Sequence, residues 1–401
     1  MQLSAERNHY VDWVRVMAFF LLIFFHCAMP FVTFGWEVKN AETSVGLSRL
    51  IYWLHQWRIP LLFFISGVGI HFSLQSRSVT AFAGERIVRL FIPLLFAMFF
   101  IIPSQVYVER LQQGQFKGSY AEFYPTVWDL VPYPEGTLTW SHLWFVVYLF
   151  VFCLMLLPVF AVFKIKTLKI LKEKIINRLT NPLLVFALFI PFTVYYFTLY
   201  INYPEQQSLL DDWFLFVFSI TLVVYGYLLG GSHSFWATCE KYRYYYLGTA
   251  LSCIILLFYG FWWNFQLPKE MGNRLYLYGI LNSIHIWTLI LALVGLFKKH
   301  LNFSNQFLKY TNKAVYPFYI LHQTVIVVAG YFVVQWPLPI VAKLLILIVS
   351  CFLTVFSVYH WLIKPFVIAR ILYGLKPKEI EEKRGFFSAN TAKTKGANGI
   401  R

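Results

Sequence analysis

The chain has 401 residues, of which 59% are hydrophobic and only 13% are charged. Soluble proteins are about 45–50% apolar and about 25% charged, so this composition disfavours a soluble globular enzyme and excludes a disordered protein, a collagen and a disulfide scaffold. The net charge of +16 is typical either of a nucleic-acid-binding protein or of cytoplasmic loops that face anionic lipid.

Ten long apolar runs follow one another along the chain, each close to the length of helix that crosses about 30 Å of hydrocarbon. The runs are continuous rather than alternating, which predicts helices and not the strands of a barrel. The predicted spans are 11–34, 49–72, 90–108, 142–163, 183–201, 213–230, 245–265, 277–297, 315–334 and 338–363. We therefore expect an all-α polytopic membrane protein with about ten transmembrane helices.

The basic residues lie mainly in alternate loops between these spans. With the N-terminus inside, 25 of the 34 Lys and Arg residues lie in inside segments and six lie in outside segments. This asymmetry is the positive-inside signal, so we expect both termini in the cytoplasm and the basic loop 164–182 against anionic lipid. The position of the charge favours a lipid bilayer, and not nucleic acid, as the partner.

The chain is expected to divide into a membrane domain and a tail. Residues 1–375 hold all ten predicted spans, and the first span has no small-residue cleavage site of the kind that marks a signal peptide. Residues 376–401 are polar, basic and nearly free of large apolar side chains after Phe387. This composition predicts a disordered basic tail on the cytoplasmic side.

The largest outside loop, 109–141, carries acids and tryptophans, namely Trp128, Asp129, Glu135 and Trp140. This combination suits sugar binding and interfacial anchoring equally well. Motifs of soluble enzymes are missing from the sequence, which has no HExxH, GxSxG, Walker or GxGxxG pattern and no CxxC pair among its five cysteines. We therefore expect no metal site, no nucleotide site and no disulfide.

Arg15 and His26 are ionisable residues inside the first span, where such a group costs about 2.5–3.5 kcal/mol. Eleven residues at 100° each return to nearly the same side of a helix, so the two share one face, about 16 Å apart. Alone, Arg15 suits a snorkelling side chain paired with Asp12, and His26 suits a hydrogen bond between helices. Together they indicate a path through the protein, with Arg15 near the cytoplasm and His26 in the outer half.

Arg58 in the segment WRIPLLFFISG lies at the depth of His26, and the second span holds no acid that would pair with it. Pro60 removes a backbone donor and is able to open the helix. Ser66 and Gly67 allow another helix or a ligand to approach closely. Arg58 is therefore either half of an ion pair with another span or a residue of a site.

Further candidates lie near the ends of later spans. Arg86 and Arg89 in ERIVRLFIP stand on one helix face at the depth of Arg15, which suits either a phosphate site or a topological anchor. His142 begins the fourth span from the outside and is either an interfacial residue or part of the site. His322 in YPFYILHQ is expected about 10 Å from the cytoplasmic surface, where a hydrogen bond to a neighbour explains it.

These segments together resemble the membrane acyltransferase 3 family. The stretch YVDWVRVMAFFLLIFFHCAM, residues 10–29, is similar to the family's first helix, which is marked by an arginine, ten residues and a histidine. The segments WRIPLLFFISG, ERIVRLFIP, HLWFVVYL and YPFYILHQ follow in the family's order. The resemblance covers about 5–365, and the DWVR start is similar to a branch that acylates periplasmic glucans.

The resemblance implies an enzyme of the bacterial inner membrane that takes an acyl group, acetyl or succinyl, from cytoplasmic acyl-CoA. It implies that the acceptor is a hydroxyl of an extracytoplasmic carbohydrate or glycan, and that no cofactor is bound permanently. Carried over by motif, His26 and Arg15 are the catalytic residues. The positions expected to bind the donor or line the pore are Arg58, Ser66, Arg86, Arg89, His142 and His322.

Two other functions compete with this one. A proton- or anion-coupled transporter of a small metabolite also uses histidine and arginine inside the membrane, although the sequence shows no internal repeat of the inverted-repeat type. A non-catalytic membrane sensor predicts that His26 is dispensable.

The charge asymmetry leads to a test of topology by reporter fusions after Lys174 and near Pro134. Alkaline phosphatase needs disulfides that form outside the cytoplasm, so we expect the fusion near Pro134 to be active and the fusion after Lys174 to be inactive. A fluorescent protein that matures in the cytoplasm is expected to give the reverse pattern. The same readout at both positions contradicts the topology.

Overall fold

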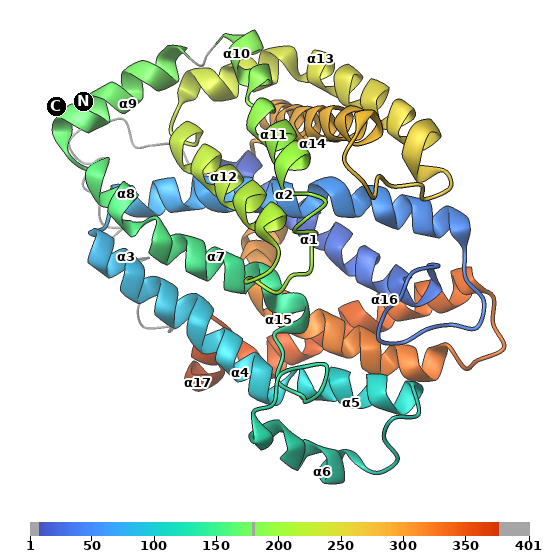
Figure 1. Ribbon diagram of the computed structural model, residues 1–401. Coiled ribbons are helices and arrows are strands. Elements are labelled where there is room, and N and C mark those ends of the chain that lie inside the picture. The colour runs from blue at the N-terminus through green and yellow to red at the C-terminus, as the bar shows by residue number, and fades with distance from the viewer. Residues whose placement is uncertain (1–7, 179–180, 377–401) are drawn as a thin grey trace.

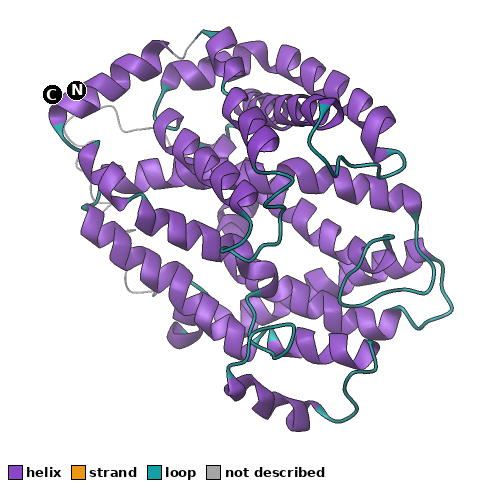
Figure 2. Cartoon of the chain, viewed as in Figure 1, coloured by secondary structure: helices purple, strands orange, loops and turns teal. Residues whose placement is uncertain are grey.

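The computed structural model describes residues 8–178 and 181–376, and within these ranges it contains helices and loops but no β-strand (Figure 2). The expected all-α class is confirmed. Most of the predicted tail lies outside the described residues. In the described part, seven helices are long and apolar enough to cross a membrane, and a bent pair, Ile170–Arg178 with Pro182–Thr198, is an eighth candidate.

Each of the ten apolar runs coincides with helix, although two of the segments, Ser141–Met155 and Trp213–Leu229, are shorter than a full span. The total of ten spans and the cytoplasmic placement of the termini stay predictions. The helices in chain order are α1 (His9–Ala28), α2 (Val45–Gln75), α3 (Val79–Arg86), α4 (Ile92–Phe100), α5 (Pro103–Gln112), α6 (Tyr120–Phe123), α7 (Trp144–Met155), α8 (Leu157–Val162), α9 (Lys166–Arg178), α10 (Pro182–Ala187), α11 (Ile190–Thr198), α12 (Trp213–Leu229), α13 (His233–Leu257), α14 (Asn273–His300), α15 (Gln306–Val333), α16 (Ile340–Ser357) and α17 (Val367–Leu372).

Short 3₁₀ and π-helical turns extend or join several of these helices. The 3₁₀ turns are Met29–Phe31, Tyr124–Asp129 and Ser141–Leu143, and the π-helical turns are Ile87–Phe91, Phe258–Trp262 and Val358–Ile363. The turn Ile87–Phe91 joins α3 to α4, so the run from Val79 to Gln112 forms one candidate span. Arg89 therefore lies within a π-helical turn, a feature that is frequent at functional sites.

Several predicted spans differ from the observed helices. The predicted span 142–163 is broken at Leu156, before Pro158, and the span 183–201 is broken at Leu188 and Phe189, before Pro191. Proline has no N–H to donate to the carbonyl four residues earlier, and its ring clashes with that carbonyl, but it is well tolerated in the first turn of a helix. Each run therefore becomes two short helices, the second with the proline in its first turn. Proline does not break every helix, because α2 continues through Pro60 and so does not open there as expected.

Other helices begin earlier than their apolar runs. Helix α13 begins at His233, where the Ser232 side chain accepts a hydrogen bond from the Phe235 amide, and so includes residues that were expected in a loop. Helix α15 likewise begins at Gln306, capped by Asn305, and not at residue 315. Side-chain caps of this kind set the first turn of a helix independently of hydropathy.

Helices α2 and α12 cross with their backbones in close contact. A Cβ added at Gly67 would lie 2.1 Å from the carbonyl oxygen of Val223, and one added at Gly226 would lie 2.0 Å from the carbonyl oxygen of Phe64. Gly67 thus allows the approach of a second helix, which is one of the two roles expected for it.

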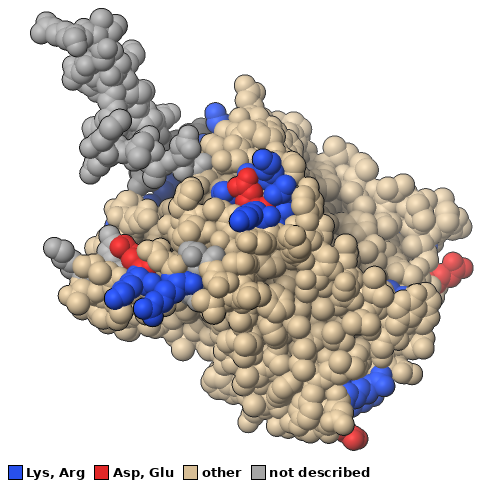
Figure 3. Space-filling model, turned by 90° about the horizontal axis from the view of Figure 1, so that it is seen from above, with Lys and Arg blue, Asp and Glu red and all other residues tan. Residues whose placement is uncertain are grey.

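Helices α1 and α14 are central, and α16 is peripheral. In the most apolar stretch of each span, 67% of the residues are buried for the spans of α1 and α14, against 22% for the span of α16. Figure 3 shows one face of the molecule on which Lys, Arg, Asp and Glu occupy only a few small patches. An outer surface this apolar is suited to hydrocarbon, as a multi-pass membrane protein requires.

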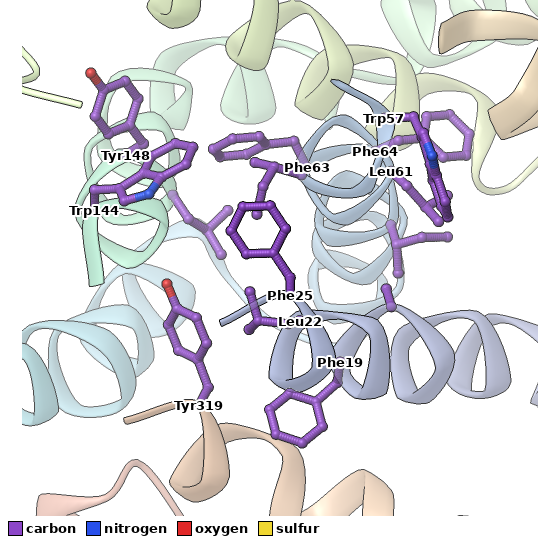
Figure 4. Packing of buried hydrophobic residues seen from close by; sticks show 14 of the residues in the cluster. Phe19, Leu22, Phe25, Trp57, Leu61, Phe63, Phe64, Trp144, Tyr148 and Tyr319 are labelled. Carbon is purple, nitrogen blue, oxygen red and sulfur yellow. The ribbon is translucent and has the colours of Figure 1, made fainter. Parts of the chain in front are cut away.

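Aromatic side chains from α1, α2, α7 and α15 meet in the centre of the molecule (Figure 4). The rings of Phe19 and Phe318 are 6.0 Å apart, and those of Phe63 and Phe145 are 4.6 Å apart. In Figure 1, α3, α8 and α9 gather at the left end of the bundle, and the loop between α1 and α2 lies at the right end. The candidate site extends from this packed centre towards the right end.

Candidate active site

A cavity of about 1070 Å³ lies between α1, α2, α5 and α15 and the loops at one end of the bundle. His26 and Arg58 both line it, as do Glu37, Glu109 and His142. The expectation that His26 and Arg58 occupy one layer is therefore met. The volume is at the upper end of the range of about 300–1,000 Å³ that is typical of small-molecule sites.

Three histidines from three parts of the chain meet beside this cavity, and two of them, His26 and His142, line it. Nε2 of His322 lies 3.0 Å from Nδ1 of His26, and the rings of His322 and His142 are 5.2 Å apart. Nδ1 of His322 lies 2.7 Å from the carbonyl oxygen of Tyr319, and Nε2 of His142 lies 3.2 Å from that of Ile320. All three histidines are candidates from the sequence.

These contacts define which nitrogen of each ring carries hydrogen. A carbonyl oxygen only accepts, so Nδ1 of His322 is the donor to Tyr319, and Nε2 of a neutral His322 is then an acceptor. Nδ1 of His26 must therefore donate to Nε2 of His322, which leaves Nε2 of His26 with its lone pair. By the same reasoning, His142 donates through Nε2 to Ile320. His26 is thus the histidine that is able to accept a proton, at Nε2.

The position of His322 differs from the expected one. It was expected about 10 Å from the cytoplasmic surface, but α15 begins at Gln306, sixteen residues before His322. At 1.5 Å per residue the side chain lies about 24 Å along the helix, opposite His26. The first turns of α15 are polar, so the apolar run from residue 315 does not include the start of the helix.

Arg58 is buried beside His26 and has no carboxylate partner among the described residues. Its side chain is 2% exposed, and its Nε and Nη1 atoms have no hydrogen-bond partner. Its guanidinium lies 4.0 Å from the centre of the Phe25 ring. The alternative of a structural ion pair with another span is therefore not met, and an unpaired buried cation of this kind is suited to bind an anion.

Arg15 and His26 both face α15, which confirms that they share one side of α1. Arg15 donates to the side-chain oxygen of Asn312 at 2.9 Å, and His26 contacts His322 ten residues further along α15. Arg15 also contacts Asp12 at 3.3 Å, the pairing expected within its own helix. The two candidate catalytic residues thus lie along a single helix–helix contact.

Arg86 and Arg89 lie in a second cluster, at the end of the bundle that holds α3. Both surround the carboxylate of Glu85, at 3.4 and 3.5 Å, together with Arg77 and with Lys376 at 3.7 Å. Four cations around one carboxylate leave three positive charges in excess. The Nε atom of Arg86 is buried without a partner.

Ser66 is half-buried on α2 and does not line the cavity of the described chain.

The two tryptophans of the loop 109–141 lie in different surroundings, and each suits one of the two roles expected for this loop, sugar binding and interfacial anchoring. Trp140 lines the cavity, and its indole donates to the carbonyl oxygen of Gln207 at 3.0 Å. Trp128 is 56% exposed and stacks on Phe99, which is typical of an interfacial anchor.

A network of amides and hydroxyls joins the histidines to the loops. Gln323 donates to Glu37 at 2.7 Å and lies 3.4 Å from both Gln105 and Ser141. Gln105 lies 3.5 Å from Nδ1 of His142 and accepts from Ser141 at 3.1 Å. The network therefore connects Glu37, in the outer loop, to His142 beside the other two histidines.

Glu37 and Glu109 are site residues that the sequence did not single out. Burial raises the pKa of Glu37 to about 7, and Glu109 adds to the rise, although hydrogen bonds from its own amide and from Gln323 oppose it. The Oε2 atom of Glu37 is buried and has no hydrogen-bond partner among the described residues. A single glutamate in an outer loop has no sequence pattern that would single it out. Gln323 could have been found, because it directly follows His322 in the segment YPFYILHQ.

Comparisons with known proteins agree with the resemblance. A family model described as "Acyltransferase domain" matches residues 8–361. Glucans biosynthesis protein C of Escherichia coli strain K12 is 28% identical over 150 residues, which cover 37% of each chain. The protein of the same name from Salmonella schwarzengrund strain CVM19633 is 24% identical over 238 residues, which cover 58% of this chain and 59% of the relative. The matches thus span less than two thirds of these relatives, and no solved structure gives a significant match.

The raised pKa of Glu37 leads to a test with Glu37→Gln. The folded carboxyl has a pKa of about 7 against an ordinary value of 4.5, so the native state loses stability as the pH rises through this window. We expect the variant to exceed the wild type in thermal stability at pH 8, by up to about 3 kcal/mol, and to lose this advantage at pH 5.

The matched control is Glu42→Gln, which removes the same charge from an exposed position on the same loop. Melting temperatures of the detergent-solubilised proteins at the two pH values supply the measurement. A difference between wild type and Glu37→Gln that does not change with pH contradicts the assignment.

Proposed function

The chain belongs to the acyltransferase domain family, and we propose that it is an integral-membrane O-acyltransferase. The proposed donor is acyl-CoA from the cytoplasm, and the proposed acceptor is a hydroxyl of a carbohydrate outside the cytoplasm, reached across the bacterial inner membrane. The observation that carries the proposal is the 3.0 Å contact between Nδ1 of His26 and Nε2 of His322, because it assigns the lone pair of His26 to Nε2. His26 lines the cavity together with Arg58, two of whose buried nitrogens have no hydrogen-bond partner in the described chain.

His26 acts as the base in the proposed reaction. Nε2 takes the proton of the acceptor hydroxyl as its oxygen forms a bond to the thioester carbon. The C–S bond then breaks, and the CoA sulfur takes the proton back from His26. Protons balance over the cycle, so no further acid is needed.

Arg58 stabilises the charge that develops during this transfer. Attack on the thioester puts a negative charge on the carbonyl oxygen, and a preorganised cation in a site that excludes water is worth far more there than in bulk solvent. The unpartnered Nε and Nη1 atoms of Arg58 supply donors that are otherwise unused. A cation already paired with a carboxylate would not serve this role as well.

His322 is a positioning residue in this scheme. It touches His26 and not the substrate, and its bond to the carbonyl oxygen of Tyr319 determines which nitrogen of His26 carries hydrogen. In catalytic triads, too, a third group orients the residue that acts as the base, and His322 has this position relative to His26.

The donor end of the protein is proposed to be the cluster around Glu85. CoA carries several phosphate groups, and Arg77, Arg86 and Arg89 provide guanidinium groups that bind phosphate through paired hydrogen bonds. Arg15 lies 11 residues before His26 on α1, about 16 Å closer to the start of that helix. The excess of cations over acids in this cluster supports the assignment.

Two routes for the acyl group fit this geometry. In one, the acceptor attacks the thioester directly while His26 acts as base. In the other, Nε2 of His26 attacks first and forms an acyl-histidine, which the acceptor then cleaves. Mass spectrometry of protein quenched with acyl-CoA alone distinguishes them, because only the second route adds the acyl mass to His26.

The class of acceptor rests on the relatives and on the cavity. Two relatives carry the name Glucans biosynthesis protein C, which associates them with glucans. The cavity is lined by side-chain amides, carboxyls and tryptophans, including Gln105, Gln113, Trp36 and Trp140, groups that suit a polyhydroxyl ligand. We propose an acetyl or succinyl group as the acyl group transferred.

The proposed function is tested with His26→Gln in purified protein supplied with acetyl-CoA or succinyl-CoA. Glutamine keeps a hydrogen-bonding group but takes no proton at neutral pH, so we expect acyl transfer and slow acyl-CoA hydrolysis to fall by about 10²–10⁴-fold. Binding of acyl-CoA is expected to persist, since the donor cluster is distant. The control is His300→Gln, at the exposed end of α14. Near-normal transfer by His26→Gln at equal protein level rejects the catalytic role.

The positioning role of His322 is tested with His322→Gln and His322→Leu. Glutamine retains an oxygen that accepts from Nδ1 of His26, whereas leucine retains no acceptor. We expect His322→Leu to lower kcat by about 10-fold or more with little change in KM for acyl-CoA, and His322→Gln to recover part of that loss. Equal losses in the two variants would instead indicate a packing role.

A further inference from the structure

The outer half of the cavity carries acids and amides but no lysine. Glu37 and Glu109 both line it, and Arg58 is the only Lys or Arg among its lining residues in the described chain. Glu37 belongs to the loop after α1, Glu109 to α5, and Arg58 to the middle of α2. The acids therefore lie towards the loops, and the cation lies deeper, beside His26.

The cations nearest to these acids in sequence are directed elsewhere. Lys39 donates to the carbonyl oxygens of Met29 and Phe34, at 3.2 and 3.0 Å. Arg110 donates to the carbonyl oxygen of Gly136 at 2.6 Å. Both cations satisfy backbone carbonyls of the outer loops, and neither forms an ion pair with Glu37 or Glu109 among the described residues.

The two carboxyl groups are held in place by neutral donors. Glu109 is 8% exposed and accepts from the hydroxyl of Tyr133 at 2.9 Å and from Gln113 at 3.2 Å. Glu37 accepts from Gln323 at 2.7 Å. Neutral donors fix the orientation of a carboxyl group without cancelling its charge, so above about pH 7, where Glu37 is ionised, the outer wall of the cavity presents a negative potential.

Arg58 gives an independent reason to expect a ligand in this cavity. It is 2% exposed, two of its nitrogens have no partner, and it lines the same cavity as the two acids. The cavity thus combines an anion-accepting floor with an outer wall that repels anions. The floor suits the transient oxyanion of the reaction, whereas the wall acts on whatever enters from the loops.

We propose that Glu37 and Glu109 form a charge filter that admits neutral or cationic polyhydroxyl acceptors and rejects anionic ones. The inference rests on the proposed function, because it concerns the acceptor of that same reaction. Like charges brought together at a site disfavour the wrong partner strongly. The filter also excludes the phosphates of CoA from this entrance, so the donor must enter from the opposite end.

The test uses three disaccharides that differ only at the reducing end, namely cellobiose, its aldonic acid cellobionate and the corresponding 1-amino-alditol. All the hydroxyls of the non-reducing ring are kept. The assay is run at pH 8, where Glu37 is ionised, and at low ionic strength, which keeps screening small. With purified protein and acetyl-CoA or succinyl-CoA, we expect kcat/KM for cellobionate to be at least about tenfold below that for cellobiose. The amine is expected to match or exceed cellobiose.

The double variant Glu37→Gln with Glu109→Gln keeps the shape of both side chains and the acceptor oxygen for Tyr133. We expect it to narrow the ratio between cellobiose and cellobionate to about twofold or less. The control is Glu135→Gln, which removes one charge from an exposed position in the same outer loops and is expected to leave the ratio unchanged. Equal use of the two sugars by the wild type, or an unchanged ratio in the double variant, overturns the filter.

A second measurement does not depend on acyl transfer. Iodoacetamide is neutral and iodoacetate is anionic, and mass spectrometry follows the rate at which each alkylates His26. We expect the double variant to raise the rate with iodoacetate relative to that with iodoacetamide by about fivefold or more, and Glu135→Gln to leave this ratio unchanged. If no disaccharide is acylated by any protein, the proposed acceptor class fails. The alkylation ratio then decides the filter separately, since an unchanged ratio overturns it and a raised ratio supports it.

Discussion

A polar side chain inside hydrocarbon has to find its hydrogen-bond partner within the protein, and α15 supplies those partners along the whole length of the candidate path. Asn312 binds Arg15, His322 binds His26, and Gln323 binds Glu37. Because the three partners belong to one continuous helix, the groups that they hold on α1 and its following loop keep a fixed order from one end of the bundle towards the other. The orientation of His26 and the position of Glu37 both depend on this contact.

The protein separates its charges along the same direction. Cations exceed acids around Glu85 at the end of the bundle that holds α3, and acids line the cavity towards the other end. Arg58 stands apart from both groups as a buried cation that has no carboxylate partner in the described part of the chain. This arrangement suits a reaction whose two substrates differ in charge and enter from opposite ends, with the bond-forming step in between. A transporter with a single pathway would have less use for an unpaired cation beside a neutral histidine.

Much of the helical framework follows from hydropathy, but the helix ends do not. The ten apolar runs all coincide with helix, because a long apolar segment in lipid has few other ways to satisfy its backbone. The breaks before Pro158 and Pro191 and the early start of α15 depended on proline geometry and on a polar capping residue, which a hydropathy average does not register. Because of that error, His322 was expected about 10 Å into its helix, whereas it lies about 24 Å from the start of α15.

The sequence by itself determined that this is an all-helical membrane protein, that Arg15 and His26 share one face, and that Arg58 lies at the depth of His26. Each of these depends on composition or on the 3.6-residue period of a single helix, which is a local property of the chain. Only the tertiary structure decided that His322 contacts His26, that two nitrogens of Arg58 have no hydrogen-bond partner in the described chain, and that Glu37 and Glu109 line the same cavity. Those facts depend on which faces of helices distant in sequence meet, because a hydrogen bond over 3 Å is sensitive to a shift of a single residue in either helix.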